Sequence, residues 1–209
     1  MSAPYPIFLD LTDRPCLVVG GGPVAEGKVR GLLAAGARIT VVSPTLTPLL
    51  SRLAAEGALA YLARAYEPGD LAGMALALAA SGDRAVSAAV LAEGRVRGVW
   101  VNAADDPDRC DFFLPALLRR GALAVAVSTG GVSPALTRAV RDALECHFPA
   151  ELGALVDVVG EVRREVRERA VPVTAETWSR ALEEELARPW QADRRDETRA
   201  RLRARLGAA

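Results

Sequence analysis

Residues 16–25 read CLVVGGGPVA, a pattern that indicates a buried strand, a glycine turn and the start of a helix. Such a turn requires glycine because the chain bends sharply and because a dinucleotide pyrophosphate must come closer to the backbone than a Cβ atom would permit. The free N–H groups of the following helix then point at that negative charge. We therefore predict a binding turn of the GxGxxA type, in which Gly20 and Gly22 are the glycines and Ala25 lets the helix pack on the strand.

A plain glycine turn in an α/β sheet is the alternative interpretation, and the strand before and the helix after it favour the binding turn. Pro23 and Val24 begin the helix, and we assign them to the cofactor site with the glycines. The dinucleotide fingerprint normally has an acidic residue at the end of the second strand, but this chain has Ser43, Pro44 and Thr45 there. We assign these three residues to the cofactor as well, and they leave the choice between NAD and NADP open.

The composition excludes several classes of partner. The 209 residues contain 26 basic and 26 acidic side chains, so we expect neither nucleic acid nor a membrane surface as a partner. The N-terminus has no basic segment leading into an apolar one, and no apolar run reaches about 18 residues, which predicts a cytoplasmic protein. Cys16, Cys110 and Cys146 form no CxxC pair, so we expect free thiols and assign no metal ligand.

Strand-like and helical segments alternate in the first half of the chain. The apolar patterns predict strands at residues 16–19, 38–43, 59–63, 74–79 and 99–103, and helices at residues 25–35, 47–56 and 84–97. This alternation is typical of a Rossmann-like, doubly wound parallel sheet, so the predicted fold class is α/β.

The alternation stops after Asn102. Apolar runs at 112–118 and 122–127, separated by Arg119, Arg120 and Gly121, predict a hairpin. Beyond it, helical patterns occupy residues 134–147, 152–169, 175–187 and 193–206. We therefore expect an NAD-binding domain at 1–113, a dimerisation module at 114–148, because a lone ribbon needs a partner surface, and a helical domain at 149–209.

A second segment whose side chains suit catalysis reads VNAADDP, at residues 101–107. It follows the fifth predicted strand, at the edge where open parallel sheets bind their ligands. We expect Asp105 to face the nicotinamide side of a bound dinucleotide. A turn or a helix cap built from Asp105, Asp106 and Pro107 is the alternative, and it stays open.

A third segment reads STGGVSP, at residues 128–134, between a predicted strand and a predicted helix. Its hydroxyls and backbone N–H groups predict a second anion-binding turn, formed by Ser128, Thr129, Gly130 and Gly131. The alternative is a helix cap with Ser133 at the N-cap and Pro134 in the first turn. Both interpretations can hold together.

These segments resemble the family of precorrin-2 dehydrogenase/sirohydrochlorin ferrochelatase, the N-terminal module of siroheme synthase and its free-standing relatives. The resemblance covers about the first 150 residues and rests on the order and spacing of YPIF (5–8), VVGGGPVAEGK (18–28), LLAAGARITVVS (32–43), VNAADDPDRCDFFLP (101–115) and STGGVSPAL (128–136). The chain beyond Pro149 fits the family's helical domain only loosely, and the sequence includes no methyltransferase half.

The resemblance implies a homodimer that oxidises precorrin-2 to sirohydrochlorin with NAD and, in many members, also inserts ferrous iron to give siroheme. Asp105 stands at the position of the family's important aspartate, and it would take a proton in both steps while NAD takes the hydride. The tetrapyrrole carries many carboxylates, for which the expected partners are Asn102, the 128–131 turn, Arg119, Arg120, Arg138 and Arg141.

The chain departs from the family at residues 79–83, where Ala-Ala-Ser-Gly-Asp replaces the common Ala-Ala-Thr-Asp-Asp. Ser81 keeps a hydroxyl there and is assigned to the cofactor. His147, the sole histidine, fits a helix cap or surface group better than a role in metal delivery, so the chelatase activity and its metal stay open. The alternative function is a dinucleotide-sensing Rossmann module without catalysis, which would need the glycine turn but neither Asp105 nor the 128–131 turn.

Overall fold

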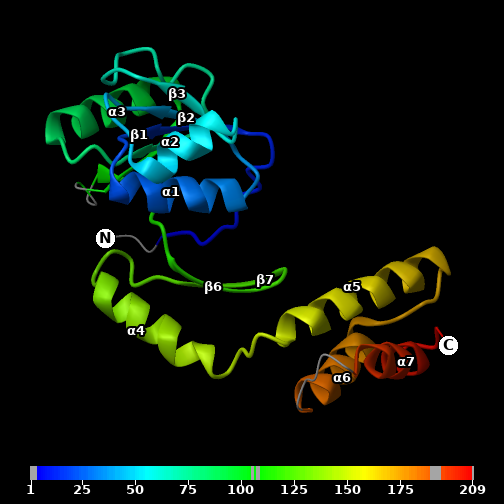
Figure 1. The fold of residues 1–209 in the computed structure, drawn as a ribbon. Coiled ribbons are helices and arrows are strands. Elements are labelled where there is room, and N and C mark those ends of the chain that lie inside the picture. The colour runs from blue at the N-terminus through cyan, green and yellow to red at the C-terminus, as the bar shows by residue number, and fades with distance from the viewer. Residues whose placement is uncertain (1–3, 105, 107–108, 189–193, 209) are drawn as a thin grey trace. The chain divides into compact units, whose positions relative to one another are not determined.

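The computed structural model describes residues 4–104, 106, 109–188 and 194–208. The chain divides into two compact units, Met1–Leu114 and Pro115–Ala209, which are drawn together in Figure 1 and described separately below. The expected subdivision of the second unit into residues 114–148 and 149–209 stays a prediction.

The first unit is built on a five-stranded parallel sheet of order β3-β2-β1-β4-β5. Its strands are β1 (Pro15–Val19), β2 (Arg38–Val42), β3 (Ala60–Leu62), β4 (Leu76–Ala79) and β5 (Trp100–Ala103). The central strand β1 pairs on both edges, with Val18 opposite Val41 of β2 and Leu78 of β4. This confirms the predicted doubly wound sheet, whose strand order reverses between β1 and β4 and so opens a crevice at their carboxyl ends.

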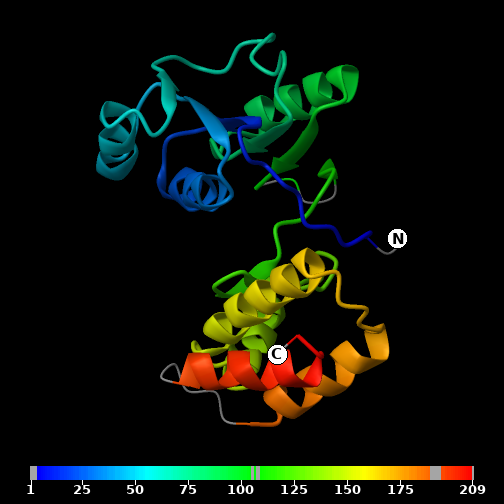
Figure 2. The same cartoon turned by 90° about the vertical axis from the view of Figure 1, so that its right-hand side faces the viewer.

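Three helices cover the two faces of this sheet, namely α1 (Pro23–Ala34), α2 (Pro48–Ala55) and α3 (Arg84–Arg97). Figure 2 shows α1 and α2 on one side and α3 on the other. Successive β1 side chains enter opposite cores: Cys16 and Val18 pack with α1, while Leu17 and Val19 pack with α3. Burial on both faces explains why β1 reads as an unbroken apolar run.

The second unit begins with a two-stranded antiparallel ribbon of β6 (Ala116–Arg120) and β7 (Leu123–Val127). The predicted hairpin is confirmed, but its strand does not begin at residue 112. The Asp111 N–H donates to the Val101 carbonyl and the Asn102 amide donates to the Phe112 carbonyl, so this segment is bound to β5 instead.

The hairpin turn is also shorter than expected. Arg119 and Arg120 belong to β6, and Arg120 lies opposite Leu123, which leaves two residues for the turn. Gly121 supplies the positive φ, 57°, that a two-residue hairpin turn requires.

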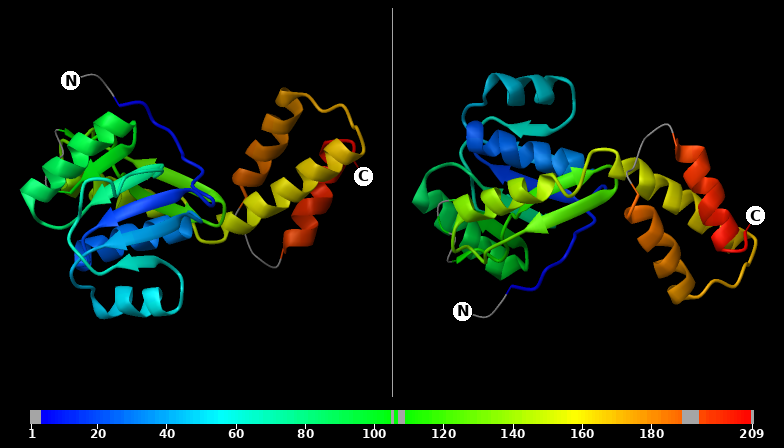
Figure 3. Two further views of the ribbon diagram at one scale, coloured as in Figure 1. Left: turned by 90° about the horizontal axis from the view of Figure 1, so that it is seen from above. Right: turned by 90° about the horizontal axis from the view of Figure 1, so that it is seen from below.

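Four helices follow: α4 (Pro134–Glu145), α5 (Leu152–Glu168), α6 (Ala175–Leu186) and α7 (Arg195–Arg205). Figure 3 shows α5, α6 and α7 gathered in one bundle, coloured yellow to red. Their shared core contains Val158, Val162, Ala181 and Leu202. Within the described part of the chain, no helix is both long and apolar enough to cross a membrane.

Charged side chains hold α7 against both of its neighbours. Arg199 and Arg203 pair with Glu161 and Glu165 of α5. On the α6 side, Glu185 is only 2% exposed and its carboxylate accepts hydrogen bonds from Arg201 and Arg205. These contacts fix the rotation of α7 about its own axis.

Candidate functional site

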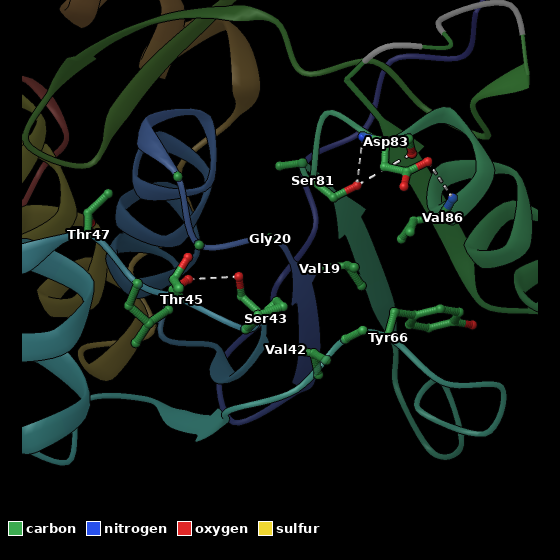
Figure 4. Close-up of a pocket in the computed structure, with 16 residues that line it drawn as sticks. Val19, Gly20, Val42, Ser43, Thr45, Thr47, Tyr66, Ser81, Asp83 and Val86 are labelled. Atoms are coloured by element: carbon green, nitrogen blue, oxygen red, sulfur yellow. Dashed lines mark hydrogen bonds between the residues drawn. The ribbon is translucent and has the colours of Figure 1, made fainter.

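A pocket of about 570 Å³ lies at the carboxyl ends of β1, β2 and β4, which is the crevice expected from the strand order (Figure 4). It contains three groups of lining residues: the glycine turn, the segment after β2, and the segments after β3 and β4. These residues are Val19, Gly20, Gly21, Gly22, Val42, Ser43, Pro44, Thr45, Leu46, Thr47, Ala65, Tyr66, Ala80, Ser81, Asp83 and Val86.

The three glycines of the turn have different surroundings. A Cβ atom on Gly20, whose φ is +121°, would lie 2.4 Å from the Ala80 carbonyl oxygen, and one on Gly21 would lie 2.0 Å from the Thr45 carbonyl oxygen. A Cβ on Gly22 would meet no atom within 4 Å. Gly20 and Gly21 therefore make room for neighbouring backbone, whereas Gly22 borders open space where a ligand can approach.

Helix α1 starts at this open position. Gly22 is its N-cap, Pro23 follows in the first turn, and no side chain caps the free N–H groups. Unsatisfied N–H groups at a helix start favour an anion. Of the residues assigned to the cofactor, Pro23 and Val24 are exposed outside the pocket lining, and Ala25 is fully buried against the sheet, as its small size suggested.

The segment after β2 is tied to the glycine turn. The Thr47 N–H donates to the Gly21 carbonyl over 2.9 Å, and the Ser43 hydroxyl donates to the Thr45 carbonyl over 2.8 Å. Ser43, Pro44 and Thr45 thus all line the pocket, although no acidic side chain stands among them. The Thr47 hydroxyl caps α2 by accepting from the Leu50 N–H.

The segment after β4 supplies Ser81 and Asp83. The Ser81 hydroxyl accepts from the Asp83 N–H, and the Asp83 carboxylate accepts from the N–H groups of Ala85 and Val86 at the start of α3. Asp83 is the one charged side chain among the lining residues that the structure describes. Its helix-capping position was not predicted as part of the site, and the capping pattern itself was the signal.

Tyr66 is a second lining residue that the sequence alone did not reveal. It stands in the loop after β3, which is a strand of only three residues, and no sequence motif marks it. Its hydroxyl donates to Glu93 of α3, and burial together with that bond raises the pKa of the Tyr66 phenol above its usual value.

Of the segment 101–107, the predicted base Asp105 lies outside the described residues. Asn102 is 8% exposed and both ends of its amide are occupied: its oxygen accepts from Lys28 Nζ and its nitrogen donates to the Phe112 carbonyl, each over 2.9 Å. Burial lowers the pKa of Lys28 below its usual value. Nothing in the sequence singled out Lys28 as a partner of Asn102, although Lys28 ends the motif VVGGGPVAEGK.

The third segment, residues 128–131, belongs to the second unit. Its hydroxyls are bonded locally: Ser128 Oγ accepts from the Gly130 N–H, and Thr129 Oγ1 accepts from the Ser133 N–H. Ser133 caps α4 by accepting from the Leu136 N–H, so the helix-cap interpretation is confirmed. Gly130 and Gly131 have φ values of 62° and 88°, and an anion-binding role for this turn stays a prediction.

The arginines expected near the substrate differ in how they are bonded. Arg120 donates to the Phe148 carbonyl over 2.6 Å, and Arg141 pairs with Asp142. Arg119 and Arg138 are exposed on β6 and α4. His147 is exposed, with Nδ1 3.1 Å from the Cys146 sulfur.

Segments of both units match models of known protein families. Residues 7–116 match a family model described as "Putative NAD(P)-binding", and residues 120–147 match one described as "Sirohaem biosynthesis protein central".

Individual proteins agree with these matches. The siroheme synthase of Methylobacillus flagellatus is 46% identical over 78% of this chain and 35% of its own length, and that of Thioalkalivibrio sulfidiphilus is 40% identical over 97% of this chain and 42% of its own. The chain thus spans well under half the length of these curated relatives. A solved structure described as SirC, precorrin-2 dehydrogenase, superposes with a TM-score of 0.73 at 26% identity, over 98% of this chain and 100% of that one.

Proposed function

Because the chain belongs to the family of sirohaem biosynthesis proteins with an NAD(P)-binding domain, we propose that it oxidises precorrin-2 to sirohydrochlorin with NAD. The observation that supports this most directly is the pocket at the carboxyl ends of β1, β2 and β4, which contains a glycine turn with open space at Gly22. The structural similarity to a precorrin-2 dehydrogenase, which covers 98% of this chain and 100% of that one, supports a tetrapyrrole as the substrate.

The residues of the pocket fit NAD. The pyrophosphate would bind at Gly22 and the free N–H groups of α1, where a Cβ atom is absent and no side chain caps the helix. Ser43, Pro44 and Thr45 line the part of the pocket where the ribose would bind. Bound NAD supplies a hydride acceptor for the oxidation.

Loss of a hydride from precorrin-2 must be accompanied by loss of a proton, and we assign the proton to Asp105. The support comes from the sequence, in which Asp105 follows the end of β5 by two residues, and open parallel sheets bind their ligands beyond the carboxyl ends of their strands. Asn102 would act beside it indirectly, by holding the segment between β5 and Phe112 through its bonded amide.

The tetrapyrrole carboxylates would bind to the 128–131 turn and to exposed Arg119 and Arg138. Gly130 and Gly131 support this because they have positive φ values and carry no side chain that would keep an anion away from the backbone. Ferrous iron would be a second substrate, with Asp105 accepting the pyrrole protons that its insertion releases. We also propose that the protein forms a homodimer and acts in the cytoplasm.

Incubation of the protein with precorrin-2 and NAD, followed by the absorbance of sirohydrochlorin, tests this function. We expect sirohydrochlorin to form at a rate that depends on NAD and to be converted further when ferrous or cobaltous ion is added. Binding of NAD with no turnover of precorrin-2 would instead support the dinucleotide-sensing alternative. Absence of NAD binding would contradict both.

A further inference from the structure

The loop formed by residues 64–70 makes one wall of the dinucleotide pocket. It follows β3, and its residues Ala65 and Tyr66 line the pocket together with Val86 of α3. Figure 4 shows Tyr66 and Val86 on one side and Ser43 and Thr45 on the other. Ser43 and Thr45 thus lie toward the glycine turn, while Tyr66 and Val86 lie on the opposite side, where the Asp83 carboxylate accepts from the Val86 N–H.

The loop is held in shape by an ion pair between its two ends. The Arg64 guanidinium donates to both Asp70 oxygens, over 2.8 and 2.6 Å. Asp70 also accepts from the Glu67 N–H inside the loop over 3.0 Å. Paired hydrogen bonds of this fork-like kind fix orientation as well as distance.

A second set of bonds attaches the loop to α3. The carboxylate of Glu93 accepts from the Tyr66 hydroxyl, from the Gly69 N–H over 3.0 Å and from the Arg97 guanidinium. The side chain of Glu93 is only 11% exposed. Tyr66 also packs against the apolar cluster on the α3 side of the sheet, which contains Val90, so its side chain is held in place at the pocket wall.

We propose that Tyr66 forms the adenine-binding wall of the pocket and that Glu93 is the residue that positions it. The inference rests on the proposed binding of NAD. Within the adenosine half of NAD, the pyrophosphate and ribose are polar and the adenine is a flat, largely apolar ring, so the adenine belongs on the side of Ala65, Tyr66 and Val86. A ring already held by Glu93 loses little side-chain freedom when the base packs on it.

The test is calorimetric titration of the full chain with ADP-ribose, which contains the adenosine half of NAD, and with nicotinamide mononucleotide, which lacks it. We expect Tyr66→Ala to weaken ADP-ribose binding by about tenfold, the usual effect of removing an aromatic partner from a stacked base. Tyr66→Leu, which keeps apolar volume without a ring, should fall between Tyr66→Ala and the parent. Binding of nicotinamide mononucleotide should be the same in the parent and in both variants.

Tyr5→Ala is the matched control, since Tyr5 is 86% exposed and does not line the pocket. It should bind ADP-ribose as the parent does. If the parent binds ADP-ribose and both Tyr66 variants bind it equally well, the assignment of Tyr66 to the adenine-binding wall is wrong, while the proposed binding of NAD is unaffected. If the parent binds neither ADP-ribose nor NAD, the proposed function fails together with this inference.

Glu93 has its own test. Glu93→Ala removes every acceptor of the Tyr66 hydroxyl and the Gly69 N–H, and we expect ADP-ribose binding to weaken by about threefold to tenfold. Glu93→Gln keeps an oxygen acceptor at the same place and should recover most of the affinity. Equal losses in Glu93→Ala and Glu93→Gln would contradict positioning through these hydrogen bonds.

Discussion

At the scale of single residues, the three glycines of the turn between β1 and α1 serve different purposes. Gly20 and Gly21 lie against backbone of neighbouring segments, and only Gly22 borders open space. A sequence pattern names the glycines but not their neighbours, so the GxGxxA fingerprint could not show that Gly21 is as tightly confined as Gly20.

This difference predicts opposite effects of substitution. Gly22→Asp should leave thermal stability unchanged or slightly higher, because Asp is a favourable N-cap, yet abolish NAD binding by placing a negative charge at the pyrophosphate. Gly21→Ala should lower stability by about 1–3 kcal/mol because its Cβ meets the Thr45 carbonyl. Thermal unfolding and NAD titration of both variants check this. An unstable Gly22→Asp that still binds NAD would reverse the assignment.

Asp105 carries the second prediction at this scale. Asp105→Ala should fold and bind NAD but form sirohydrochlorin about 10²- to 10⁴-fold more slowly, the usual cost of losing a general base. Asp106→Ala is the control, since Asp106 pairs with Arg109, and it should lose much less. Steady-state rates decide: parental rates in both variants would remove Asp105 from the mechanism. An Asp105→Ala that still inserts metal would remove only its role in the second step.

At the scale of secondary-structure elements, α7 depends on carboxylates of two other helices. Glu185 is the most buried of these, and its hydrogen bonds with Arg201 hold the pKa of the carboxyl below the ordinary value of 4.5. A lowered pKa in the folded state means that the unfolded state binds the proton more tightly. The stability from Glu185 is therefore complete above about pH 4.5 and is lost as the pH falls through the lowered pKa.

Glu185→Gln tests this. At pH 7 it should destabilise the protein by about 1.5–3 kcal/mol, since charged hydrogen bonds to Arg201 and Arg205 are replaced. The difference between the parent and the variant should shrink as the pH falls below 4.5 and through the lowered pKa of Glu185. Glu176→Gln, on an exposed position of the same helix, should change stability little at any pH. Thermal unfolding followed by circular dichroism at several pH values gives the comparison, and a constant difference between parent and variant would contradict it.

The elements also show what the sequence can and cannot supply. Apolar patterns predicted the five strands of the parallel sheet and the seven helices within a few residues, because strands buried on both faces are short apolar runs and helices repeat their apolar positions every three to four residues. The strand expected from residue 112 was wrong because residues 111 and 112 bond to β5, a long-range contact that no local pattern contains. Tyr66 and Lys28 were missed for the same reason: their partners, Glu93 and Asn102, are 27 and 74 residues away.

At the scale of the whole molecule, we predict a homodimer formed through α4. Leu136 and Val140 are exposed by 53% and 39%, and their spacing of four residues places them on one face of this helix, where a second copy of the chain can cover both. Leu136→Asp should therefore give a monomer without loss of folding. Val96→Asp, on a fully exposed position of α3, should stay dimeric. Sedimentation at micromolar concentration distinguishes these outcomes, and a monomeric parent protein would contradict the prediction.

The central position of β1 also bears on how the protein is made. Its second edge is covered only by β4, which is synthesised some sixty residues later. A growing chain in which β2 has emerged but β4 has not thus carries an apolar strand with one edge unpaired, and such edges are prone to aggregation. Ribosome-bound chains in which residue 76 has not yet left the ribosome should be digested by protease at β1, and chains in which residue 103 has left it should resist digestion there. The segment proposed to bind the cofactor is thus translated early but gains its second strand partner only after β4 has been made.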